Sequence, residues 1–219
     1  MTRPQRHLRA RRATMALGAL FGVATSIAVP LAAAQSDATV AGAADIAPGR
    51  TTLDVLAGRR ASVAGSVRPA VAGRRVALQR HAAGHWHTID HATTTAGGAF
   101  AFRFRPREPG SARLRVLVDA ARREIGRLNV YRRAAVSWYG PGLYGNKLSC
   151  GGTLTPGTLG VANKTLPCGA RVTLRHGHRV VRVRVVDRGP YVGGREYDLT
   201  AATRAKLHFG GVGSVLVAD

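Results

Sequence analysis

V-V-D-R-G-P-Y-V-G-G-R-E-Y-D-L-T, residues 185–200, places two carboxylates, Asp187 and Asp198, in a basic and glycine-rich region. Acidic side chains are scarce in this chain, which has 11 Asp and Glu against 33 Lys and Arg. Asp187 follows a run of alternating valines and arginines at 180–186, a pattern typical of a strand. A carboxylate directly after such a strand is a candidate general acid.

The residues around this stretch predict a small, closed β-barrel. Period-2 alternation predicts strands at 135–139, 171–174, 180–186 and 214–217. One short helix is expected at 201–207, with Asp198 or Thr200 near its N-cap and Gly210-Gly211 at its end.

Residues 50–133 predict a separate β-sandwich. Short alternating runs are divided by glycine- and proline-rich turns, and Phe100, Phe102 and Phe104 alternate with small or charged residues, as in a half-buried strand. The stretch resembles the immunoglobulin-like modules attached to bacterial exported proteins. We place the boundary to the second domain, 134–219, near residues 131–134.

Four histidines occur close together in this module, His81, His85, His87 and His91. Their spacing suits neither a helix face nor a zinc clamp. A polar hairpin around Trp86 is therefore favoured over a metal site, and we expect no metal.

The first 34 residues resemble a secretory signal. Five arginines precede an apolar stretch at 13–31, and Ala32-Ala33-Ala34 offers a cleavage site. The alternative is a membrane anchor, which Gly18, Gly22 and Pro30 disfavour. Residues 35–49 are small and polar and predict a linker. We therefore expect export to a bacterial cell envelope and no stable membrane span after cleavage.

The net charge of +22 indicates a polyanionic partner or surrounding. Loss of the five leader arginines leaves +17. The arginines are spread over the predicted strands and no nucleic-acid-binding motif is present. An exported protein meets acidic wall polymers, so we expect these as partners and no specific nucleic acid.

Cys150 and Cys168 are the two cysteines of the chain. An even pair in an exported protein favours a disulfide. The alternative is a metal pair, but the remaining ligands at zinc-like spacing are missing.

Four motifs in order carry a specific resemblance. They are S-W-Y-G at 137–140, T-L-P-C-G at 165–169, V-D-R-G-P-Y at 186–191 and Y-D-L-T-A-A at 197–202. Together they resemble the double-psi β-barrel domain of rare lipoprotein A (RlpA) proteins, which is related to expansins and barwin-like proteins. The predicted fold is therefore all-β, with an immunoglobulin-like sandwich followed by a six-stranded double-psi barrel and one short helix.

The resemblance implies an exported protein that acts on peptidoglycan glycan strands, with no cofactor and as a monomer. Asp187 and Asp198 match the family's functional aspartates. The implied substrate-binding residues are Trp138, Tyr139, Tyr144, Asn163, Arg188 and Tyr191.

Three of these assignments have a structural alternative. Asp187 could pair with Arg188, Arg195 or a backbone turn, Asp198 could cap the helix, and Trp138 could pack in the barrel core.

Two positions depart from the family's transglycosylase members, which carry a Glu and a His where this chain has Gly152 and Asn163. Two functions therefore stay open, lytic transglycosylase and non-catalytic, expansin-like wall loosening. An inhibitor or signalling role on the same scaffold is a third, since a fold does not determine function. Soluble 1,6-anhydro sugar products would separate the first from the others.

Overall fold

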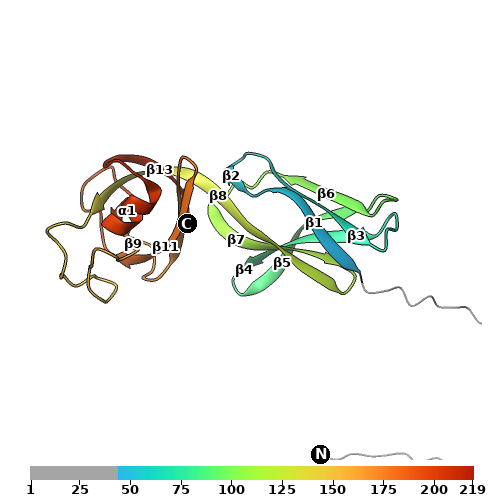
Figure 1. Cartoon of the computed structure of the whole chain (residues 1–219), viewed down its shortest axis with the longest axis horizontal. Coiled ribbons are helices and arrows are strands. Elements are labelled where there is room, and N and C mark those ends of the chain that lie inside the picture. The colour runs from blue at the N-terminus through green and yellow to red at the C-terminus, as the bar shows by residue number, and fades with distance from the viewer. Residues whose placement is uncertain (1–43) are drawn as a thin grey trace, which may run out of the picture. The chain divides into compact units, whose positions relative to one another are not determined.

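The computed structural model describes residues 44–219 (Figure 1). The predicted leader lies outside these residues, as does the predicted linker up to residue 43. The rest of that linker region is not a loop, because the first strand already begins at Asp45 and pairs with Arg68. No helix within residues 44–219 is long and apolar enough to cross a membrane.

The described residues form strands and one short helix, which confirms the all-β class. The strands are β1 (Asp45–Thr52), β2 (Asp54–Leu56), β3 (Ala61–Arg68), β4 (Arg75–Ala82), β5 (His85–Thr93), β6 (Ala99–Phe104), β7 (Gly110–Val118), β8 (Ala121–Tyr139), β9 (Gly160–Ala162), β10 (Arg171–His176), β11 (Arg179–Asp187), β12 (Tyr197–Thr200) and β13 (Gly213–Ala218); the helix is α1 (Ala201–Leu207).

Two sheets share one core in the first module. One sheet has the order β1-β3-β6, and the other contains β5, β4, β7, the first half of β8, and β2 (Figure 1). Val63 and Phe102 from the first sheet lie in the same buried cluster as Leu78, Leu114 and others from the second. This is a sandwich, as alternation along the strands predicts. Its immunoglobulin-like character stays a prediction.

The second module is a closed six-stranded barrel, as predicted. Its strands follow the order β12-β9-β11-β10-β13-β8, and β12 also pairs with β8, which closes the ring. The pairs β9–β11 and β8–β12 are parallel, whereas the other pairs are antiparallel. β9 and β12 complete the ring and were absent from the strands expected from alternation.

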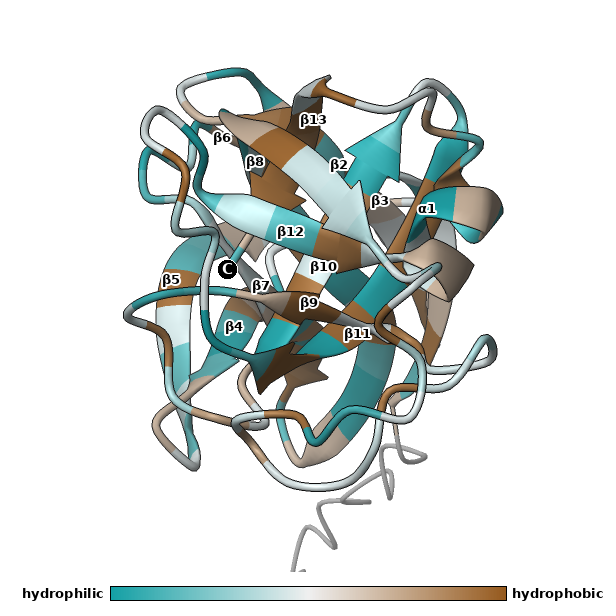
Figure 2. Ribbon diagram, turned by 90° about the vertical axis from the view of Figure 1, so that its left-hand side faces the viewer, coloured by the Kyte–Doolittle hydropathy of each residue, from teal (hydrophilic) through white to brown (hydrophobic). Residues whose placement is uncertain are grey.

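The barrel has its own apolar core, made of alternate residues of its strands. Val136, Val161, Leu174 and Leu199 are fully buried there. Along β12 in Figure 2 a teal segment is followed by a brown one. Asp198 is half-buried and Leu199 is fully buried, as expected of a strand with one face in the core.

Helix α1 is capped at its start by Thr200, whose side chain accepts a hydrogen bond from the backbone N–H of Thr203. Asp198 therefore does not cap the helix. The helix ends at Leu207 and is capped by His208, which has a left-handed φ of 49°, and not by the expected Gly210-Gly211. His208 takes the C-terminal position that glycine most often fills.

β8 runs without a break through the predicted boundary at 133/134. Its first half pairs with β7 and its second half with β13. The two buried clusters nevertheless stop at Val130 and start again at Ala134. We propose to keep the boundary at 133/134 and the second domain at 134–219, and to start the sandwich domain at Asp45, because β1 pairs with β3 and Ile46 lies in the sandwich core.

Candidate carboxylate site

The two candidate carboxylates lie in one row across four neighbouring strands of the barrel. Asp187 on β11 and Asp198 on β12 are both register partners of Ala162 on β9, and Asp198 is also the partner of Ser137 on β8. Residues at paired positions point to the same face of a sheet. With strands about 4.8 Å apart, the two aspartate Cα atoms are separated by roughly 10 Å.

A β-bulge sets the direction of Asp187. Val185 pairs with Val161 and Asp187 pairs with Ala162, so Val186 is an extra residue in β11. The Val186 side chain occupies the space beside Gly160, where an added Cβ would approach Val186 Cγ2 to 2.4 Å. Bulges of this kind turn a side chain away from the regular ladder.

The Asp187 carboxylate is held through one of its two oxygens. Oδ1 accepts hydrogen bonds from the backbone N–H groups of Ser149, at 2.9 Å, and Arg188, at 2.8 Å. The hydrogen bonds made within residues 44–219 use Oδ1 alone. The second oxygen is therefore available to a ligand.

Asp198 is held by a side chain that sequence reasoning did not select. The buried hydroxyl of Ser137 donates a hydrogen bond to Asp198 Oδ1. Ser137 is the first residue of the S-W-Y-G motif, and that position was the only sequence signal for its role. Parallel pairing of β8 with β12 brings together these two residues, 61 positions apart.

Tyr139 lies on the same face as Ser137, two residues further along β8. Its hydroxyl oxygen is buried and has no hydrogen-bond partner within residues 44–219. Burial raises the pKa of Tyr139 well above its ordinary value, as do the negative charge of Asp187, the closeness of the hydroxyl to that carboxylate and, last, the charge of Asp198. The hydroxyl therefore stays protonated and keeps a proton to donate toward the carboxylates.

Asn163 and Arg188 organise the loop beside Asp187. Asn163 Oδ1 accepts from the backbone N–H groups of Thr165 and Leu166, at 3.0 and 2.8 Å, and its Nδ2 donates to the Glu196 carbonyl at 3.0 Å. Arg188 Nη1 donates to the carbonyls of Asn163 and Leu166. The roles of both residues in substrate binding stay predictions, because these groups already serve the loop.

The predicted disulfide is present between Cys150 and Cys168, whose Cα atoms are 5.4 Å apart. The backbone N–H of Cys150 also donates to the Val186 carbonyl at 3.2 Å. The disulfide therefore ties two loops to the end of β11, next to Asp187.

The candidate aromatic residues divide into two sets. Trp138 pairs with Leu199, so it points away from the carboxylate face; it packs against the barrel core with the Arg204 guanidinium carbon 4.3 Å from its ring centroid. Tyr144 and Tyr191 are 37% and 83% exposed. These two tyrosines are free to contact a ligand, whereas the Trp138 ring already contacts the barrel core and Arg204.

Gly152 stands where the family's transglycosylases carry Glu. Its φ of +80° is one that side-chain-bearing residues rarely adopt, but a Cβ there would meet no atom within 4 Å. The loop has room for a longer side chain, at some cost in backbone strain.

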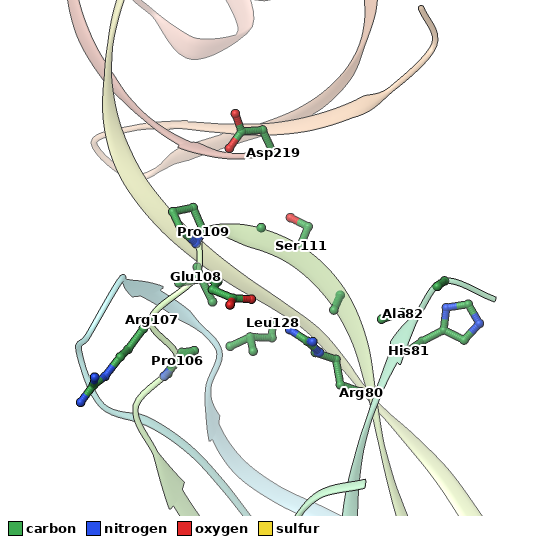
Figure 3. Close-up of a pocket in the computed structure, with 14 residues that line it drawn as sticks. Arg80, His81, Ala82, Pro106, Arg107, Glu108, Pro109, Ser111, Leu128 and Asp219 are labelled. Atoms are coloured by element: carbon green, nitrogen blue, oxygen red, sulfur yellow. The ribbon is translucent and has the colours of Figure 1, made fainter. Parts of the chain in front are cut away.

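A cavity of about 560 Å³ is lined by none of the residues of the carboxylate row (Figure 3). Arg80, Glu108 and Leu128 of the sandwich line it, together with Asp219. Within residues 44–219, no three His, Cys, Asp or Glu side chains are grouped to hold a metal ion. The four histidines lie on the β4–β5 hairpin, where His81 packs edge-on against Trp86 with ring centroids 5.0 Å apart.

Residues 133–218, which form this barrel, match the family model described as lytic transglycolase. The chain is 42% identical over 106 residues to a probable endolytic peptidoglycan transglycosylase RlpA of Synechocystis. The matched region covers 42% of this chain and 33% of that relative. It is 44% identical over 73 residues to the endolytic peptidoglycan transglycosylase RlpA of Campylobacter jejuni, covering 32% of this chain and 26% of that protein. A probable RlpA of Aquifex aeolicus is 40% identical over 80 residues, covering 35% of each chain.

The C-terminal barrel is therefore an RlpA-like double-psi β-barrel. The chain spans about a quarter to a third of the length of these curated relatives.

Proposed function

We propose that this chain acts on the glycan strands of peptidoglycan by lytic transglycosylase chemistry, with Asp187 as the single acid and base. The observation that carries the proposal is the Asp187 carboxylate, placed by a bulge with one oxygen fixed by two backbone N–H groups and the other free. The names of the relatives, which are endolytic peptidoglycan transglycosylases, support the same reaction class.

The reaction needs only one carboxyl group because it consumes no water. The protonated Asp187 side chain gives its proton to the glycosidic oxygen, and the bond from that oxygen to the anomeric carbon breaks. The sugar's own 6-hydroxyl then bonds to the anomeric carbon and loses its proton to the Asp187 carboxylate. The product is a 1,6-anhydro sugar, and Asp187 is again protonated.

Asp198 has a supporting role in this scheme. Its carboxylate, oriented by Ser137, supplies negative charge on the same barrel face. Such a charge stabilises the positive, oxocarbenium-like sugar of the transition state. Tyr144 and Tyr191 offer exposed rings on which sugar faces stack.

The second candidate function is non-catalytic binding and loosening of the wall, as in expansins. Gly152 and Asn163 favour it, because they stand in place of the family's Glu and His. Asn163 cannot transfer a proton, and its amide is already bonded to the backbone.

The proposal includes export by the predicted leader, location in the cell envelope and action as a monomer. An exported transglycosylase meets its substrate there, and the described disulfide suits an oxidising compartment.

The test is incubation of the purified protein with peptidoglycan sacculi, followed by mass spectrometry of the soluble material. Asp187→Asn removes the acid, and Asp45→Asn is a matched control because Asp45 is exposed on β1. Anhydro-muropeptides from the wild type and the control, but not from Asp187→Asn, are expected. If none of the three proteins releases product and all pellet with the sacculi, the enzyme proposal is wrong and wall binding remains.

A further inference from the structure

The outer face of the larger sandwich sheet is rich in arginine. On β7 and β8, Arg113 is the register partner of Arg127, Arg115 of Glu124, and Leu117 of Arg122. Residues that alternate with these, including Leu114 and Val116, are fully buried in the sandwich core. The four arginines therefore share the face that points away from the core, and we call them the arginine face.

Arg115 is held in position by its neighbours. Its Nε donates to Gln79 Oε1 at 2.7 Å, and Gln79 Nε2 donates to the Thr88 hydroxyl at 3.1 Å. Its guanidinium carbon lies 4.2 Å from the ring centroid of Trp86. The hydrogen bonds made within residues 44–219 leave both Nη groups of Arg115 unused. The guanidinium group is therefore fixed in place with two nitrogens available to a ligand.

The four arginines of this face carry more positive charge than the one carboxylate beside them, that of Glu124, can neutralise. Glu124 pairs with Arg113 at 3.1 Å, but Arg127 lies directly opposite Arg113 on the next strand. Burial and then the charge of Arg122 lower the pKa of Arg115. Like charges directly opposite each other destabilise a sheet, so a bound anion would relieve a repulsion that the fold otherwise retains.

Arginines also gather on the barrel, where Arg171, Arg182 and Arg184 line one hollow. Burial, followed by the charges of Arg127 and Arg171, lowers the pKa of Arg182 on β11. Arg171 and Arg184 are register partners on β10 and β11. The arginines thus extend over several strands, a length that one small anion does not fill.

The ligand must be recognised by its charge and not by a sugar ring. The face of Trp86 is taken by Arg115, and Arg113 lies 5.4 Å from the same centroid. Guanidinium groups on facing strands suit a phosphate, because its tetrahedrally arranged oxygens can accept hydrogen bonds from more than one arginine. A planar carboxylate is satisfied by the paired N–H groups of a single arginine.

We propose that the arginine face of the sandwich binds a linear wall polymer whose units are joined by phosphodiester links. This site is separate from the carboxylate row of the barrel, and it holds the protein on the wall whether or not the barrel is catalytic.

The test measures binding of the purified protein to poly(glycerol phosphate) over a range of salt concentrations. The variant Arg113→Gln/Arg115→Gln/Arg127→Gln is compared with Arg50→Gln/Arg103→Gln/Arg105→Gln. The control removes the same charge from exposed positions, two on strands of the smaller sheet and one directly after β6. We expect the first variant to lose about tenfold or more in affinity, with a salt slope lower by about 2, and the control to lose less than about threefold. Equal losses of affinity in the two variants would mean that binding depends on the net charge of the protein and not on this face, and would overturn the proposal.

A gain-of-function variant guards against a folding defect. Glu124→Gln removes the acid that pairs with Arg113 and is expected to tighten binding about threefold. No gain would contradict the proposal. Polygalacturonate and single-stranded DNA are run alongside, and tighter binding to either one would show that the occupant is wrong. Release of anhydro-muropeptides by the arginine variant tests the barrel independently, since that reaction does not use this face.

Discussion

Asp187 and Asp198 lie in one row of the barrel but are held in different ways. Two backbone N–H groups fix one oxygen of Asp187, whereas a serine hydroxyl binds Asp198. Backbone donors cannot rotate away, so Asp187 has the more rigid position. A rigid carboxylate with one free oxygen suits proton transfer, and a hydroxyl-bound carboxylate suits charge stabilisation.

The unpartnered hydroxyl of Tyr139 leads to a stability prediction. Tyr139→Phe is expected to raise the free energy of unfolding by about 1 kcal/mol, because it removes a buried polar group that makes no hydrogen bond. Urea denaturation measures this change. Tyr191→Phe, at a position 83% exposed, is the control and is expected to change nothing. A loss of stability in Tyr139→Phe would mean that the hydroxyl hydrogen-bonds a neighbour, with the Asp187 carboxylate as the candidate acceptor.

At the residue scale, the sequence indicated which residues belong to the site better than it indicated which groups they bond to. The two cysteines were paired from compartment and number alone, and the disulfide is present. Ser137 was missed because its partner is reached only through a parallel strand pair, which leaves no local pattern. Asn163 was selected as a ligand contact by position in a motif, and no sequence rule indicated that its amide would bond the backbone of its own loop.

At the scale of elements, α1 is joined to the barrel by two threonines. Thr200 Oγ1 lies 3.2 Å from both the N and the O of Gly160, and Thr203 Oγ1 donates to the same carbonyl at 2.9 Å. Both threonines are buried. The helix start is therefore fastened to β9, the strand between the two carboxylate strands.

Thr200→Ala is expected to lower the free energy of unfolding by about 2 kcal/mol, because the helix loses its N-cap and a buried backbone group loses a partner. Chemical denaturation checks the value. Thr200→Ser keeps the hydroxyl and should retain most of the stability. If both variants lose the same amount, the methyl group and not the cap is the stabilising part.

The disulfide is expected to stabilise the barrel by about 3 kcal/mol, as the chain-entropy model predicts for a loop of 18 residues. The double variant Cys150→Ser/Cys168→Ser should show this loss in urea. Reduced wild type should unfold at the same urea concentration as the variant. A reduced protein as stable as the oxidised one would refute the assignment of a stabilising role.

The missed elements share a physical reason. β9 has three residues and β12 has four, too few for alternation to be recognised. Both are held by pairing with distant strands and not by local propensity. The helix end was placed at Gly210-Gly211 because glycine has the lowest cost at positive φ, whereas here His208 takes that conformation.

On the scale of the whole molecule, the buried Tyr131 and Tyr197 and the half-buried Tyr139 predict a fall in stability at high pH. Burial and then hydrogen bonds to Asp54 and Asp219 raise the pKa of Tyr131 and Tyr197, and burial raises that of Tyr139. The unfolded chain ionises its tyrosines near pH 10. Below that pH the stabilisation is complete, and above it stability falls until the folded tyrosines ionise as well.

Thermal unfolding between about pH 8 and about pH 11 measures this dependence. The melting temperature is expected to be nearly flat at first and to decline above about pH 10. Tyr139→Phe should decline less steeply, since it has one such tyrosine fewer. A variant that declines as steeply as the wild type would contradict the contribution of Tyr139.

The unbroken strand β8 also limits how this protein can evolve. Successive residues of a strand point to opposite faces, so inserting one residue between Tyr131 and Ala134 would exchange the inward and outward side chains of the rest of β8. Val136 would leave the core and Ser137 would enter it. Length changes at the junction are therefore tolerated only in even steps, and recombination that swaps either domain for another must preserve this parity.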